Sequence, residues 1–134
     1  MSKENVALIK GIYDAFGKGD VPAVLGAMAP GIVWNEAENF PYADKNPYVG
    51  PDAIVQGVFM RLATEWDGFT VAPEEILDAG DAVVVLGRYR GSYKATGKPQ
   101  NTQMVHVWRV KDGKVAQFQQ YADTLQVARV IGKA

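Results

Sequence analysis

The sequence NTQMVHVWRVKDGKVAQFQQYAD, residues 101–123, predicts two antiparallel strands joined by a tight turn at 111–113. Apolar and polar residues alternate along both halves, which is the period of a half-buried strand. Residues 69–78 and 82–93 show the same alternation, and short joins between sequential strands make them antiparallel neighbours. The second half of the chain therefore predicts a four-stranded meander.

Before residue 69 the apolar residues recur at helical spacing instead. The pattern predicts a helix that ends at 17–19, a short helix that begins after Asp20, a strand at 32–36 and a third helix that begins at 51–52. The expected apolar faces of these helices are Val6, Ile9, Tyr13 and Phe16; Val24, Leu25 and Met28; and Val55, Val58, Phe59, Leu62 and Trp66.

Helices that precede the meander, rather than alternate with its strands, indicate an α+β fold. We expect three N-terminal helices packed into a curled, mostly antiparallel sheet, with one deep pocket on the concave side. A length of 134 residues suits a single domain over residues 1–134. The aromatic-rich connection at 37–50 predicts a lid or rim, and 124–131 a short closing helix.

Composition excludes several classes of site. The chain has 14 Lys and Arg against 15 Asp and Glu, no Cys and one His. This balance disfavours nucleic-acid binding, and the residue types exclude thiolate metal sites, disulfides and multi-histidine centres. We expect no metal and no cofactor. No apolar run is long enough to cross a membrane and no secretory signal is recognisable, so we expect a cytoplasmic protein.

His106 is the first candidate for chemistry. Thr102, Met104, His106 and Trp108 share one strand face, and Arg109 lies on the other, so the first face is predicted to be interior. Two interpretations stay open: an imidazole satisfied within the core, or an acid, base or hydrogen-bond donor oriented by a carboxylate.

Two carboxylates could serve this imidazole. Glu36 shares a strand face with Trp34, and Asp123 ends the strand beside that of His106. Burial in an apolar pocket would raise the pKa of either carboxyl and make it a better base near neutral pH. The alternatives are a solvated strand end for Glu36 and a helix N-cap for Asp123.

Tyr13 could donate its phenolic hydrogen to a substrate carbonyl, or simply pack in the core. Apolar side chains would wall the pocket around these groups. The expected walls are Phe16, Trp34, Phe59, Met104, Trp108 and Phe118.

Several segments resemble the SnoaL-like and ketosteroid-isomerase-like proteins of the nuclear transport factor 2-like superfamily. They are Tyr13–Phe16, Gly19–Asp20, Ile32–Trp34, Gly50–Ile54 and Val107–Val115. The resemblance covers nearly the whole chain. It implies a cone of helices against a curled sheet, frequent pairing as a homodimer across the sheet, and no metal or organic cofactor.

Two branches of this superfamily suggest different site residues. Similarity to ketosteroid isomerases implies roles for Tyr13 and Glu36, although His106 stands where the second acid belongs. Similarity to SnoaL-like polyketide cyclases implies Asn35, His106 and Asp123. Strand parity requires a bulge or strand end for either Asn35 or Asp123 to face inward.

These observations predict a protein that binds a small, largely apolar, carbonyl-bearing molecule. If it is an enzyme, it abstracts a proton next to the carbonyl without a cofactor, as an isomerase or an aldol cyclase, with Asp123 or Glu36 as base. The alternative is a non-catalytic ligand-binding or dimerisation module. A homodimer is expected because apolar residues occupy both faces of the strand segment 83–86.

Overall fold

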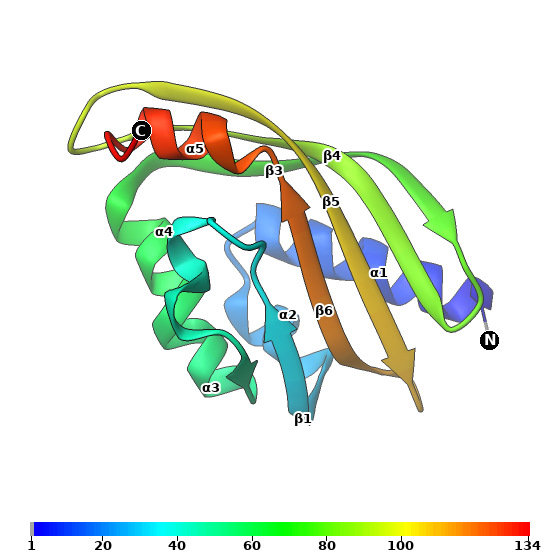
Figure 1. The fold of residues 1–134 in the computed structure, drawn as a ribbon. Coiled ribbons are helices and arrows are strands. Elements are labelled where there is room, and N and C mark those ends of the chain that lie inside the picture. The colour runs from blue at the N-terminus through cyan, green and yellow to red at the C-terminus, as the bar shows by residue number, and fades with distance from the viewer. Residues whose placement is uncertain (1) are drawn as a thin grey trace.

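The computed structural model describes residues 2–134. Helices occupy the concave side of a strongly curved sheet, and the long strands arch over them (Figure 1). The helical elements are α1 (Ser2–Gly17), α2 (Val21–Gly26), the 3-10 turn η1 (Pro41–Lys45), α3 (Pro51–Ile54), the π-helical η2 (Val55–Phe59), α4 (Met60–Glu65) and α5 (Thr124–Val130). The strands are β1 (Met28–Asn35), β2 (Tyr48–Val49), β3 (Trp66–Asp78), β4 (Ala82–Tyr93), β5 (Pro99–Lys111) and β6 (Lys114–Ala122).

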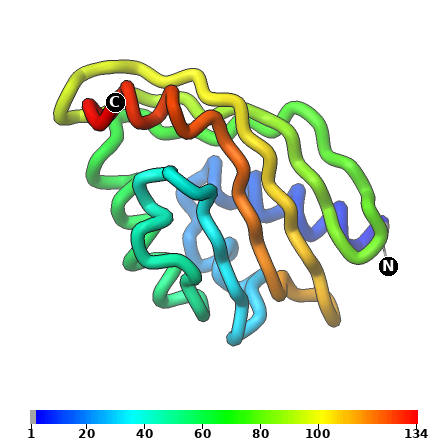
Figure 2. The backbone as a smooth tube through the Cα atoms, in the orientation of Figure 1, coloured from blue at the N-terminus to red at the C-terminus, as the bar shows by residue number. Residues whose placement is uncertain are grey.

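The sheet order is β2-β1-β6-β5-β4-β3. The four C-terminal strands form the predicted antiparallel meander, and β1 joins its β6 edge in parallel. The tube in Figure 2 shows how this sheet curls over α1, which runs beneath the long strands. The α+β architecture with a mostly antiparallel sheet is thus confirmed.

Strand alternation places the predicted inner face of β5 in the core. Thr102, Met104, His106, Trp108 and Val110 are all buried, whereas Arg109 is exposed. Each long strand contributes one such face, so the inward side chains of β4, β5 and β6 form the roof over the helices.

Two boundaries and one connection differ from the sequence prediction. Met28 begins β1 instead of ending the second helix, and Trp66 begins β3 instead of ending the third. Both side chains are buried in the positions they actually occupy, so apolar spacing alone could not separate the two assignments. The connection at 37–50 also contains structure of its own, η1 and β2.

The third helix contains a π-helical turn where Gly57 meets Tyr48. A Cβ atom on Gly57 would lie 2.1 Å from Cε1 of Tyr48, so only glycine permits this approach. The next residues, Val58 and Phe59, face the interior cavity. Close packing of β2 on this helix therefore helps to shape the wall of the site.

Candidate functional site

A cavity of about 50 Å³ lies between α1, the α3–α4 helix and the concave face of the sheet. One water molecule needs roughly 10–15 Å³ of such volume. The central cavity as it stands therefore has room for about three to five water molecules, which suits only a compact molecule. Its lining is largely aromatic and aliphatic: Ile12, Tyr13, Phe16, Val24, Trp34, Glu36, Phe40, Val58, Phe59, Leu62, Phe69, Val71, Tyr89, His106, Trp108, Phe118 and Gln120.

Glu36 is the carboxyl group of this lining. It follows β1 directly, and only 3% of it is exposed. The Trp34 indole donates to its Oε2 at 3.0 Å, and Asn46 holds its backbone through two hydrogen bonds. Burial raises the pKa of Glu36 from 4.5 to about 7, against smaller opposing effects of Trp34 and Arg61. The carboxyl group is thus poised to exchange a proton near neutral pH.

His106 lies deep in the same lining between two phenols. Its Nδ1 is 2.5 Å from Oη of Tyr13, and its Nε2 is 2.5 Å from Oη of Tyr89. Its hydrogen-bond partners are therefore tyrosines and not the carboxylate that sequence reasoning expected. Burial lowers the pKa of His106 from 6.5 to about 3, so the ring is neutral at physiological pH.

Tyr13 joins this arrangement from α1. Its Oη accepts a hydrogen bond from the Trp108 indole at 2.9 Å, and its ring stacks on that of His106. Burial raises the pKa of Tyr13 far above its ordinary value. The phenol therefore keeps its proton and can act only as a hydrogen-bond donor or acceptor.

The predicted aromatic walls converge on the cavity. Trp34 stacks on Phe118 with ring centroids 3.8 Å apart, and Phe59 contacts both Phe16 and Trp34 edge to face at 5.7 Å. Trp108 packs against Phe118 at 4.6 Å. These rings surround Glu36 and His106, which are both buried.

The structure places three predicted site residues elsewhere. Asn35 lies on the opposite face of β1, where it borders a hollow on the outside of the sheet. Asp123 is exposed and caps α5, with its carboxylate accepting from the backbone N–H of Gln126. Met104 is buried opposite Gly87 but does not line the cavity. The register irregularity of β1 lies before Val33 and leaves Asn35 opposite Gln119, while Asp123 follows the last residue of β6, so neither lines the cavity.

Two polar residues of the site escaped sequence reasoning. Tyr89 alternates with Arg88 and Arg90, and this alternation already pointed it inward. Gln120 shares the face of Phe118 on β6, and its Nε2 donates to Oη of Tyr89 at 2.7 Å. The signal for both was strand parity.

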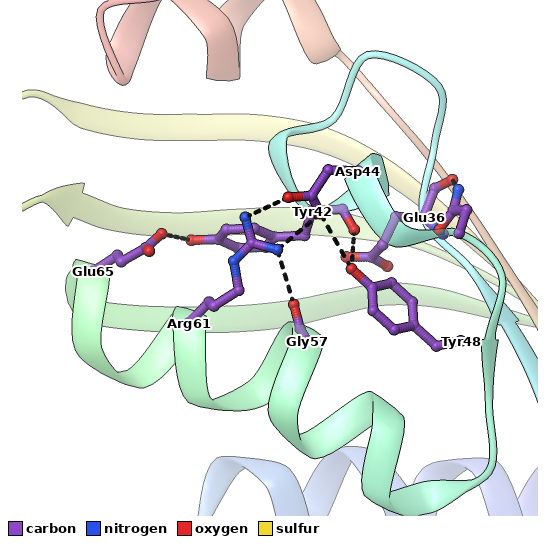
Figure 3. A network of polar contacts seen from close by, with 8 residues as sticks. Glu36, Tyr42, Asp44, Tyr48, Gly57, Arg61 and Glu65 are labelled. Atoms are coloured by element: carbon purple, nitrogen blue, oxygen red, sulfur yellow. Dashed lines mark hydrogen bonds and ion pairs between the residues drawn. The ribbon is translucent and has the colours of Figure 1, made fainter.

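The connection at 37–50, which the sequence predicts to be a lid or rim, is here called the rim and contributes Phe40 to the cavity lining. Phe40 reaches the cavity, while Tyr42, Asp44, Tyr48, Arg61 and Glu65 form a polar group outside it, here called the loop cluster (Figure 3). Tyr42 donates to Glu65 at 2.6 Å, and the Arg61 guanidinium binds both carboxylate oxygens of Asp44. The loop cluster fastens the rim to α4.

Two kinds of site are absent from residues 2–134. No group of three or more His, Asp or Glu side chains is arranged to hold a metal ion. No helix within this range has the length and apolar character needed to span a membrane.

Comparisons with known proteins agree with this architecture. The sequence profile of the SnoaL-like domain family matches residues 9–118. A nuclear transport factor 2-like protein from Burkholderia thailandensis E264 is 41% identical, with a TM-score of 0.90 over 94% of this chain and 95% of that one. No curated protein matches the sequence.

Two further structures extend the comparison. TerC, co-crystallised with polyporic acid, is 27% identical, with a TM-score of 0.85 over 96% of this chain and 98% of that chain. A putative SnoaL-like polyketide cyclase from Jannaschia sp. CCS1 shares the fold at 20% identity, with a TM-score of 0.84 over 99% and 94% of the two chains. The family match and the shared cone together show that this chain belongs to the SnoaL-like family, with the nuclear transport factor 2-like fold.

Proposed function

We propose that the protein binds a small, largely apolar molecule with a carbonyl group and removes a proton from the carbon next to that group, without a cofactor. The observation that carries this proposal is Glu36, a carboxyl group inside an aromatic cavity whose pKa is raised to about 7. A base is most effective when its pKa is near the working pH.

The rest of the lining supports the same reaction. As the Glu36 carboxylate takes the α-proton, negative charge moves onto the carbonyl oxygen, which then needs hydrogen-bond donors. Tyr13, backed by His106, supplies a donor that keeps its proton. Return of the proton to another carbon gives isomerisation, and attack of the enolate on a second carbonyl gives aldol closure.

We assign the base to Glu36 rather than Asp123. Asp123 is exposed and engaged as the cap of α5. Glu36 is enclosed among the aromatic walls. The co-crystallisation of TerC, at 27% identity, with polyporic acid supports a ligand-binding role within this family.

Hydrogen exchange of small ketones tests the assignment. The protein is incubated with cyclopentanone or cyclohexanone in D₂O, and loss of the α-proton signals is followed by NMR. Glu36→Gln should slow the catalysed exchange by about 10²–10⁴-fold, the usual contribution of a general base. Asp123→Asn is the matched control and should leave the rate unchanged. Loss in Asp123→Asn alone would transfer the role to Asp123.

The alternative is a binding module that releases its ligand unaltered. In that case the ketones bind but exchange no faster than in buffer, and Glu36→Gln changes affinity only. Catalysed exchange that depends on Glu36 excludes this alternative.

We also propose that the outer face of the sheet pairs two copies of the chain. Val83 and Val85 are fully buried, whereas Val84 and Leu86 are only partly buried on the opposite face. A hollow of about 270 Å³, bordered by Val107, lies on this outer face. Sedimentation should give a dimer at micromolar concentration, and Val107→Asp a monomer. A wild-type monomer would contradict the pairing.

A further inference from the structure

Two tyrosine hydroxyls share one imidazole at the centre of the cavity. Tyr13 approaches His106 from α1, and Tyr89 approaches it from β4, each with 2.5 Å between the hydroxyl oxygen and a ring nitrogen. Tyr13, His106 and Tyr89 are all among the residues that line the cavity. The three groups form a continuous row, here called the Tyr13–His106–Tyr89 row.

Each end of the row accepts a hydrogen bond whose direction is fixed. The Trp108 indole can only donate, so it gives its hydrogen to Tyr13. Gln120 accepts from the backbone N–H of Ala37 through Oε1, which leaves its NH₂ group facing Tyr89 as a donor. Neither tyrosine can therefore place its own hydrogen at these outer contacts.

The Tyr13–His106–Tyr89 row has one more polar hydrogen than it has hydrogen bonds between its members. A neutral imidazole carries one N–H, and the two phenols carry one hydrogen each, which makes three. The two contacts with His106 use only two of them. His106 is neutral because it is fully buried. One hydroxyl hydrogen therefore has no acceptor within the row.

The tautomer of His106 determines which tyrosine holds this hydrogen. With the hydrogen on Nε2, the ring donates to Tyr89 and accepts from Tyr13, so the spare hydrogen belongs to Tyr89. With the hydrogen on Nδ1, the roles reverse and the spare hydrogen belongs to Tyr13.

We propose that the Tyr13–His106–Tyr89 row offers a ligand a single hydroxyl hydrogen that either tyrosine can donate, with the His106 tautomer selecting the donor. The matching ligand is a compact apolar molecule with one ketone-type oxygen. Identification of the ligand class rests on the proposed function, whereas the interchange of donors does not. Tyr89 is thereby a second hydrogen-bond donor of the site. If Tyr13 were a fixed donor, Tyr89 would have no such role.

Nitrogen NMR of the ligand-free protein tests the interchange. The ¹⁵N shifts of the His106 ring identify which nitrogen carries the hydrogen. Tyr13→Phe leaves Tyr89 as the partner and should give the Nε2–H form, whereas Tyr89→Phe should give the Nδ1–H form. Opposite tautomers in these matched variants support the proposal. The same tautomer in both variants, or a doubly protonated ring at pH 7, overturns it.

Cyclopentanone and methylenecyclopentane test the ligand class, because they share a shape and differ in the acceptor oxygen. The ketone should bind about three- to tenfold more tightly, the range expected for one net hydrogen bond. Its C=O stretching frequency should fall on binding to the wild type and to either single variant, but not to the double variant.

If the C=O frequency falls in the wild type and in Tyr89→Phe but not in Tyr13→Phe, then Tyr13 is a fixed donor. That result would overturn the interchange of donors. Equal affinity for the two probes, or no binding of either, would contradict the proposed function. The ¹⁵N shifts of His106 in the ligand-free variants would still test the interchange of donors independently.

Discussion

The central cavity and the loop cluster contain the same types of residue, but the pKa values of Glu36 and Asp44 are shifted in opposite directions. Each contains carboxylate and tyrosine side chains, yet burial raises the pKa of Glu36 to about 7, while the Arg61 guanidinium holds the pKa of Asp44 below its usual range. A carboxyl group surrounded by aromatic side chains can act as a base, whereas one beside a cation stays ionised and serves as a structural anchor.

The two regions also differ in how fully their polar groups are paired. In the loop cluster, Asp44 binds Arg61 through two contacts, and Tyr42 donates to Glu65 (Figure 3). In the cavity, a neutral His106 leaves one hydroxyl hydrogen of the Tyr13–His106–Tyr89 row without an acceptor within the row. A saturated cluster stabilises the rim, whereas an unsaturated one leaves capacity for a ligand.

The largest expected effect concerns acid stability and His106. Its pKa is lowered from 6.5 to about 3, so the unfolded chain binds more protons between these values and stability falls as pH drops through them. At about 1.36 kcal/mol per pH unit, the wild type should lose about 4 kcal/mol from this group by pH 3.5. His106→Gln should lack that loss.

Urea unfolding at pH 7 and pH 3.5 measures the difference. Tyr13→Phe keeps the imidazole and serves as the control, with a pH dependence like that of the wild type. An identical pH dependence in His106→Gln and the wild type would show that the folded imidazole is not held neutral.

Glu36 should give a somewhat smaller effect of opposite sign. Its pKa is raised from 4.5 to about 7, so the folded protein binds the extra proton and stability falls as pH rises between these values. The loss is about 3 kcal/mol and is complete above pH 7. Glu36→Gln should therefore gain about 3 kcal/mol over the wild type between pH 4 and pH 8.

The same unfolding measurements at pH 4, 6 and 8 follow this change. Asp44→Asn is the control, because the Arg61 guanidinium lowers the pKa of Asp44, so this carboxyl group does not share the raised pKa of Glu36. A constant difference between Glu36→Gln and the wild type at all three pH values would refute the buried acid.

Sequence periodicity was sufficient for the architecture because strand parity and helical spacing follow from local backbone geometry. It placed His106 and Trp108 on an interior face, and both are buried. For Glu36 it left a pocket position and a solvated strand end open, and only the structure shows that the residue is buried. It failed at Met28 and Trp66, where an apolar residue fits the end of a helix and the start of a strand equally well.

The site was less predictable because its contacts join distant segments. Asn46 holds the backbone of Glu36 across a loop, and Gln120 is oriented by Ala37, 83 positions away in sequence. Family similarity suggested Asp123, but a residue directly before a helix is also a natural N-cap. Only the structure shows that Asp123 is the N-cap of α5 and does not line the cavity.

A moderate effect is expected where the loop cluster meets the third helix. In Gly57→Ala the new Cβ atom would overlap the Tyr48 ring, whose hydroxyl is held by the Tyr42 carbonyl at 2.6 Å. Overpacking of this kind destabilises by about 1–3 kcal/mol. Gly11→Ala is the matched control in a helix, because nothing lies within 4 Å of its added methyl group.

Thermal unfolding should separate these glycine variants in direction. Gly11→Ala should stabilise the protein by about 0.5–1 kcal/mol, since alanine favours a helix over glycine. Gly57→Ala should destabilise it. Equal gains in both variants would show that Tyr48 moves aside without loss.

The smallest effect links the two regions directly. The side chains of Arg61 and Asp44 are 27% and 48% exposed, so solvent screens their attraction and Asp44→Asn should cost about 0.5 kcal/mol or less.

Arg61 also lowers the pKa of Glu36 slightly, in opposition to burial. Arg61→Gln should therefore move the pKa of Glu36 further upward, while Asp44→Asn, which leaves the cation in place and removes a negative charge, should not. Carboxyl ¹³C titration of Glu36 in both variants measures this, and an unchanged pKa in Arg61→Gln would mean that Arg61 does not act on the cavity acid.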